Sequence, residues 1–317
     1  MFKSLSLKVI IFGFIFTFFS SFGQSYFIGL FNSSIREDLL ISHGQFGTIY
    51  ASATLLSSFI LIWIGKKIDD MNVFKFSIFV IFLLSFACYF FSTVKILSFL
   101  FVGIFLLRLS GQGLMSHTAT TTVSRYFENA RGKALSITWL GLSAAEFILP
   151  VSIIFLLTFV SWRDIWIYIS LLTLIFLPIV SFILVKKLKL EAREGIKENK
   201  IQKKNIKQWT RSEVIKDYKF YIIALNMLGM PSIATGIFVY QSFIISSKSW
   251  GPFIFAQSFM AYSILSVITL SISGFLIDKF TSRKLLVYMN IPLFFAVLVL
   301  ILFDNPVSSF ILLGLIG

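Results

Sequence analysis

Two charged side chains, Arg108 and Glu146, lie inside long apolar stretches of the chain. A charge in the middle of a bilayer costs from about 2.5 to more than 10 kcal/mol, so it is kept only where a partner or a water-filled cavity receives it. Arg108 stands about 16 residues before a polar turn and Glu146 about 13 residues after it. At 1.5 Å per residue both reach roughly 20 to 24 Å into the bilayer. The sequence therefore predicts that they pair across neighbouring antiparallel helices.

This predicted pair has two interpretations. In the functional one, Arg108 faces a central cavity and binds an anionic substrate, while Glu146 couples transport to protons. In the structural one, the two groups form a permanent buried ion pair that only holds two helices together. Gln112 follows Arg108 by one helical turn and is expected to point the same way.

Other polar side chains stand on segments that would line the same cavity. Gln24 ends a polar stripe on a Phe-rich segment, and Tyr240 follows Pro231, which allows a helix to bend. Each of these groups has an alternative role as a contact between helices. The predicted substrate-binding residues are Arg108, Gln24, Gln112 and Tyr240, and the predicted coupling residue is Glu146.

The elements that must position these residues are apolar segments close to the ~20 residues that cross a bilayer. With 57% hydrophobic and 13% charged residues, the chain has too little polar surface for a water-soluble domain of its size. The sequence predicts an all-α polytopic membrane protein with nine complete spans and the start of a tenth. The complete spans lie at about residues 7–30, 45–64, 76–94, 97–123, 134–159, 164–185, 220–245, 252–275 and 285–303.

Basic residues fall mostly in every second gap between the spans. If the N-terminus is cytoplasmic, the outer loops carry only Arg36, Lys95, Arg163 and Lys248. Positive loops stay on the cytoplasmic side, so this asymmetry predicts a multi-pass protein of the cell (inner) membrane with its N-terminus inside. The net charge of +14 is explained by these loops, and nucleic acid is not an expected partner.

The sequence contains none of the motifs that would indicate an enzyme. Its one cysteine, Cys88, excludes an internal disulfide or a CxxC metal site, and His43 and His117 are far apart. There is no P-loop, nucleophile elbow or dinucleotide fingerprint. We expect no cofactor, no metal and no catalytic residue, and we expect energy to come from solute gradients.

A segment of mixed charge divides the chain. We expect an N-terminal bundle of six spans at residues 1–186, a cytoplasmic linker at 187–218 and a second, partial bundle at 219–317. Thr210 and Glu213 have the spacing of a capping box, which predicts a short surface helix before the seventh span.

A G-x-x-I-D string occurs at Gly65 to Asp69 and again at Gly274 to Asp278, and such repeats are typical of transporters with two related halves.

These strings resemble motifs of the major facilitator superfamily. Gly65 and Asp69 match its loop signature after the second span, although Asp70 and Asn72 replace expected residues there. The string RYFENARGKALSI and the pair Trp162-Arg163 are also similar to the family, and GQSYFIGLFN loosely resembles its carboxylate-type members. The resemblance implies that these strings form a gating motif. The alternative is that they only determine the topology and form a surface ion pair. The residues of the predicted gating motif are Gly65, Asp69, Gly274, Asp278, Lys279 and Arg283.

The resemblance implies two six-helix bundles and a secondary transporter that works by alternating access. Arg108 makes a small organic anion such as a carboxylate the expected solute, with a proton or a counter-anion in symport or antiport, and the protein is expected to be monomeric. The alternatives are a receptor-like member that does not transport and an inactive fragment. Because the family has twelve spans, we expect the sequence to continue beyond Gly317.

Overall fold

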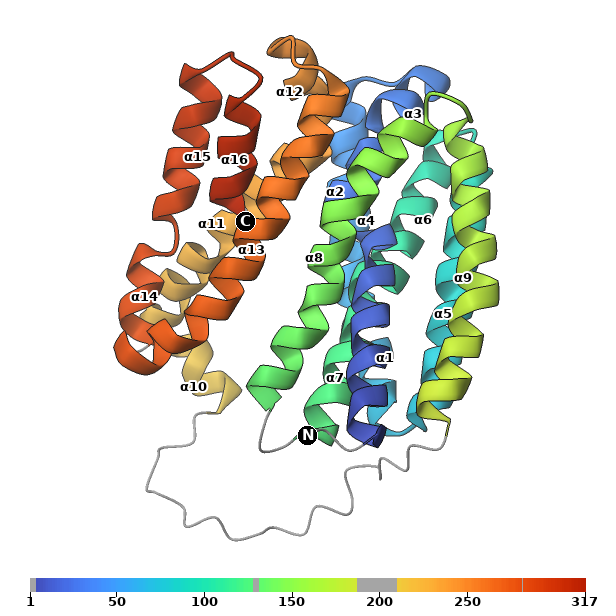
Figure 1. Cartoon of the computed structure of the whole chain (residues 1–317), viewed down its shortest axis with the longest axis vertical. Helices are drawn as coiled ribbons and strands as arrows, with labels where there is room; N and C mark the ends of the chain where they lie inside the picture. The colour runs from blue at the N-terminus through green and yellow to red at the C-terminus, as the bar shows by residue number, and fades with distance from the viewer. Residues whose placement is uncertain (1–3, 128–130, 187–209, 281) are drawn as a thin grey trace, which may run out of the picture.

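The computed structural model describes residues 4–127, 131–186, 210–280 and 282–317, and every regular element in these ranges is a helix (Figure 1). Nine of the described helices are long and apolar enough to cross a membrane, which confirms the nine predicted spans. They run over Ser6–Gly23, His43–Asp69, Val73–Ser92, Leu97–Tyr126, Arg131–Leu156, Trp162–Val185, Tyr218–Val239, Pro252–Ser273 and Lys284–Leu302.

The helices before residue 187 are called the first half here. Within it, α1 packs against α8 and α5 packs against α9. Side chains cap the N-termini of several of these helices. For example, Ser42 and Gln45 form a capping box at the start of α4. The elements are α1 (Ser4–Ser20), η1 (Ser21–Gly23), α2 (Ser25–Leu30), α3 (Asn32–Leu39), α4 (His43–Lys66), η2 (Lys67–Asp69), α5 (Val73–Ser92), α6 (Leu97–Leu107), η3 (Arg108–Met115), α7 (Ser116–Tyr126), α8 (Arg131–Leu156) and α9 (Trp162–Val185).

The helices after residue 209 are called the second half. In this half α13 and α15 both pack against α16. Thr210 and Glu213 cap α10 reciprocally, which confirms the short helix predicted before the seventh span. The elements are α10 (Arg211–Lys216), α11 (Tyr218–Val239), α12 (Gln241–Ser247), α13 (Pro252–Phe280), α14 (Ser282–Tyr288), α15 (Ile291–Leu302) and α16 (Ser308–Ile316).

The first span is not the continuous helix that the sequence predicts. A 3₁₀ turn at Ser21–Gly23 and an extended residue, Gln24, interrupt it between α1 and α2. The fourth span is distorted at the same level, because Arg108–Met115 form a π-helix. The distorted segments touch through glycines: a Cβ on Gly23 would lie 2.3 Å from the carbonyl oxygen of Leu107. Only glycine allows this approach, which brings the start of the π-helix against the first span.

The two halves meet along α8 and α13 and along α2 and α11. Figure 1 shows α3 and α12 at one end of the molecule, called the far end here, and α10 at the opposite end, called the linker end. The helices α8 and α13 diverge toward the linker end in this view. Large apolar side chains such as Trp63 and Leu225 remain exposed on the periphery, as expected for a surface in contact with lipid.

Candidate functional site

Arg108 is buried at the junction of α6 and the π-helix, with 5% of its surface exposed. Its Nη1 donates hydrogen bonds to the carbonyl oxygen of Gly23 at 3.0 Å and to the Ser25 hydroxyl at 3.2 Å. The guanidinium also lies 5.3 Å from the ring centre of Tyr50, a distance suited to a cation–π interaction. Its Nε–H has no hydrogen-bond partner. This buried cation therefore keeps an unused donor.

Glu146 is equally buried, with 6% of its surface exposed, but it lies at another place in the molecule. It lines a cavity of about 340 Å³ between α8 and α13. Its carboxylate is close enough to the hydroxyls of Tyr26 and Tyr262 to interact electrostatically with both. The cavity wall also contains Trp139 and Ser143 of α8 and Ser266, Thr269 and Ser273 of α13.

The predicted pairing of Arg108 with Glu146 is wrong. Both residues are described by the structure, and no ion pair or hydrogen bond joins them. The depth along a helix fixes only the height of a side chain, whereas its direction around the helix decides which neighbour it meets. Arg108 turns toward η1 and α4, and Glu146 turns toward α13. A permanent ion pair between these spans is therefore excluded as the role of Arg108.

The other predicted binding residues are distributed over different parts of the structure. Gln24 is half-buried in the break of the first span, next to Ser25, which binds Arg108. Gln112 is half-buried inside the π-helix, and its backbone nitrogen would lie 2.4 Å from a Cβ on Gly23. Tyr240 of the second half has its hydroxyl against Gly47 of α4, three residues before Tyr50. The described residues show no contact between Tyr240 and Arg108.

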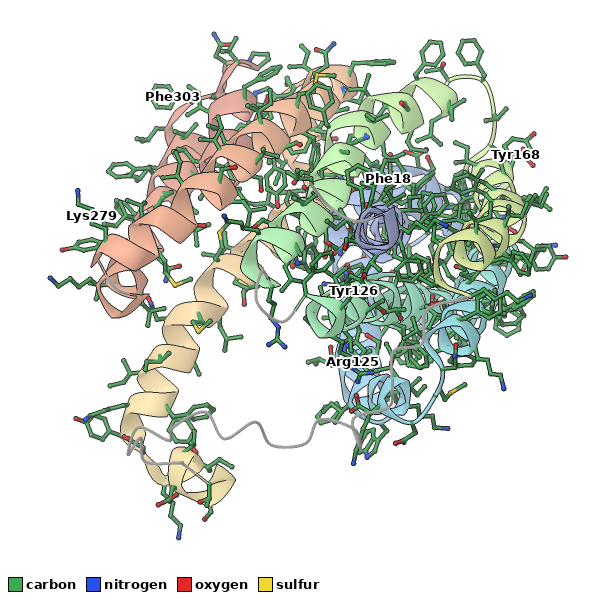
Figure 2. The ribbon with its side chains drawn as sticks, turned by 60° about the horizontal axis from the view of Figure 1, so that its bottom comes forward. Phe18, Arg125, Tyr126, Tyr168, Lys279 and Phe303 are labelled. Atoms are coloured by element: carbon green, nitrogen blue, oxygen red, sulfur yellow. The ribbon has the colours of Figure 1, made fainter. Side chains whose placement is uncertain are left out.

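Residues of the predicted gating motif form a cluster at the linker end of the first half. Asp69 makes an ion pair with Arg125, which also donates a hydrogen bond to the carbonyl oxygen of Ile68. His117 contacts the carbonyl oxygen of Gly65 at 3.0 Å. In Figure 2, Arg125 at the end of α7 and Lys279 at the end of α13 lie on opposite sides of this face. Gly274 and the side chains of Asp278 and Arg283 lie outside the described residues.

The ion pair between Asp69 and Arg125 is partly exposed to solvent, so we expect it to contribute little to stability. Asp69→Asn and Arg125→Gln should each lower the apparent unfolding midpoint slightly, with a coupling energy of about 0.2–1 kcal/mol in a double-mutant cycle. Thermal unfolding of the two single variants and the double variant in detergent measures this coupling. Strictly additive effects would show that the two side chains do not interact in solution.

Several site residues were missed by the sequence analysis. Tyr50 and Ser25 contact Arg108, and no local pattern indicates this because they come from other spans. Tyr262, Ser266, Thr269 and Ser273 were also missed, although their spacing of four, three and four residues places them on one face of a helix. That spacing in an apolar span was a detectable signal.

Hydrogen bonds join the two halves near the far end. Asn32 donates to the carbonyl oxygen of Val239 at 3.0 Å and accepts from the Ser242 hydroxyl at 2.7 Å. Gln241 donates to the carbonyl oxygen of Tyr26 at 3.1 Å. Closer to the middle of the spans, the Ser263 hydroxyl donates to the carbonyl oxygen of Ser143 at 2.6 Å. Hydrogen bonds thus hold the two halves together at the far end, and the cavity lies between this contact and the linker end.

The family model of the Major Facilitator Superfamily matches residues 13–317. The fold resembles the solved structure of a bacterial homologue of the human lysosomal transporter Spinster, in an inward-facing and unoccupied conformation, with a TM-score of 0.66 and 14% identity over 100% of this chain and 75% of that chain. It also resembles the nucleoside transporter NupG, with a TM-score of 0.68 and 13% identity over 99% of this chain and 78% of that one. No curated protein matches the sequence.

Proposed function

Because this chain belongs to the Major Facilitator Superfamily and is a multi-pass membrane transporter, we propose that it moves a small organic anion, such as a carboxylate, by alternating access. The observation that carries this proposal is the environment of Arg108. Its guanidinium is buried without an acidic partner among the described residues, and its Nε–H is unused. Burying an unpaired charge is costly, and a carboxylate that binds in the plane of the guanidinium would offset that cost.

The arrangement of the two halves supports a transport cycle. Hydrogen bonds fasten the halves at the far end, while the cavity between α8 and α13 extends toward the linker end. Arg108 is not among the residues that line this cavity, so a solute would reach its guanidinium only when the halves rearrange. Opening the far end would require these contacts to break, and closure at the linker end would then expose the solute to the other side.

The proposal also assigns each end of the molecule to one side of the membrane. Most of the basic residues that the structure describes lie at the linker end (Figure 1), and positive loops remain in the cytoplasm. We therefore assign the linker end and the N-terminus to the cytoplasmic side of a cell membrane. The described conformation then corresponds to a state that is open toward the cytoplasm.

Uptake into proteoliposomes tests the proposed function. Purified protein is reconstituted, loaded with a mixture of unlabelled carboxylates, and offered radiolabelled mono- and dicarboxylates and their uncharged amides. We expect exchange of at least one carboxylate and no exchange of its amide. Exchange restricted to uncharged or cationic solutes would overturn the anion assignment. Specific binding of the carboxylate without exchange would instead identify a receptor-like protein.

A further inference from the structure

The short helix α2 touches both the buried cation and the second half of the molecule. Its first residue, Ser25, is buried, and its hydroxyl accepts the hydrogen bond from Nη1 of Arg108 at 3.2 Å. The next residue, Tyr26, accepts a hydrogen bond at its carbonyl oxygen from Gln241 of the second half. A contact with Arg108 and a contact between the two halves are therefore adjacent on one short helix.

Every residue of α2 is buried, and the side of the helix that meets the second half is closely packed. The ring centre of Tyr26 lies 5.6 Å from that of Phe259 on α13 and 6.5 Å from that of Phe238 on α11. Further along α2, a Cβ on Gly29 would stand 2.0 Å from the carbonyl oxygen of Phe238. Because a packed contact of this kind does not deform gradually, α2 cannot shift without loosening the contact between the halves.

The break in the first span separates the movement of α2 from that of α1. Gln24 has an extended backbone, so the helical hydrogen bonds of the span are interrupted immediately before α2. A short break can absorb a change of backbone dihedral angles that a continuous helix resists. The bond between Ser25 and Arg108 therefore helps to hold the start of α2 in its present position.

Binding of a solute by Arg108 would compete with this bond. Arg108 does not line the cavity between the halves, so a guanidinium that binds a solute there must leave its present contacts with Gly23 and Ser25. A hydrogen bond in which donor and acceptor are ionised is roughly twice as strong as a bond between neutral groups, so a carboxylate can replace the Ser25 hydroxyl. Loss of the Ser25 bond would then release the start of α2.

We propose that Ser25 is the positioning residue that couples the binding of an anion by Arg108 to the separation of the two halves at the far end. In the described conformation the guanidinium holds Ser25, and α2 keeps the far end closed. When a carboxylate draws the guanidinium away, α2 moves and the far end opens. By linkage, opening of the far end raises the affinity of Arg108 for the anion by the same factor. This inference rests on the proposed function for its solute.

The first test needs no solute. With Cys88 replaced by serine, spin labels at the exposed positions Glu37 and Ser246 report the distance between the halves at the far end. Ser25→Ala should shift the distance distribution to longer values than in the wild type. The matched control Ser77→Ala removes a buried hydroxyl that bonds within its own helix, α5, and should leave the distribution unchanged. A wild-type distribution in Ser25→Ala would overturn the proposal, whatever the solute is.

A double variant separates the bond to Arg108 from a general weakening of α2. Arg108→Met removes every donor from which Ser25 could accept. Adding Ser25→Ala to Arg108→Met should therefore produce no shift beyond that of Arg108→Met alone. Additive shifts in the double variant would show that Ser25 acts independently of Arg108, and this result would contradict the proposed coupling.

Addition of a carboxylate that the wild type binds tests the link to the solute. The carboxylate should shift the wild-type distribution to longer distances. Ser25→Ala should bind the carboxylate at least as tightly as the wild type but show no further shift, whereas a merely structural serine would leave the response to the anion intact. A solute-dependent shift of wild-type size in Ser25→Ala would therefore overturn the proposal. If the wild type binds no carboxylate, the proposed solute fails, and the two measurements without solute still decide the role of Ser25.

Discussion

Replacing Arg108 with glutamine is expected to abolish exchange of the organic anion while the protein still folds and reaches the membrane. Glutamine keeps a donor for the carbonyl oxygen of Gly23 but removes the positive charge. Loss of one partner of a buried charge pair costs about 2–5 kcal/mol. This corresponds to roughly 30- to 4,000-fold weaker binding of the anion.

Arg108→Lys tests which property of the side chain matters. Lysine keeps the charge but loses the planar set of donors, one of which, Nε–H, is unused in the structure. We expect partial activity with a higher KM for the anion. Arg131→Gln is the matched control, because Arg131 is exposed and its loss should leave exchange unchanged. Wild-type exchange by Arg108→Gln would contradict an anion site at this residue.

Enlarging Gly29 should force the two halves apart at the far end. Gly29 lies on α2, and a Cβ there would stand 2.0 Å from the carbonyl oxygen of Phe238 and 2.4 Å from Nε2 of Gln241. Both partners belong to the second half, and the nearer atom is backbone, which cannot rotate away. Gly29→Ala should therefore destabilise the state that is closed at the far end and strongly reduce transport.

Spin labels measure this separation directly. With Cys88 replaced by serine, labels at the exposed positions Glu37 and Ser246 report the distance between the halves at the far end. Gly29→Ala should shift the distance distribution to longer values. Gly236→Ala is the matched control, since a Cβ at Gly236 on α11 meets nothing within 4 Å. An unchanged distribution in Gly29→Ala would show that this contact does not hold the halves together.

The sequence was sufficient for the spans because their length and apolar composition follow from the thickness of the bilayer. It was also sufficient for α10, since Thr210 and Glu213 act on backbone groups only three residues away. The break at Ser21–Gly23 and the π-helix from Arg108 were not predicted. Hydropathy is averaged over a whole span, so it does not reveal a local change of helix geometry within that span.

The contacts that the site residues make with other helices were the least predictable feature of the site. Arg108 and Glu146 were recognised because charges in apolar spans are rare, and this signal is local. Their contacts depend on the rotation of each helix, and Arg108 meets the broken first span through glycines at 23 and 111. The bond from Asn32 to Val239 joins residues far apart in sequence. No spacing rule along one chain segment indicates such a contact.

Equilibrium binding of a labelled carboxylate to detergent-purified protein, in competition with its uncharged amide, examines the role of Arg108 most directly. If Arg108 binds the anion, the wild type should bind the carboxylate and ignore the amide, and Arg108→Gln should bind neither with measurable affinity. Binding of the carboxylate by Arg108→Gln with wild-type affinity, or equal competition by the amide in the wild type, would contradict an anion site at Arg108.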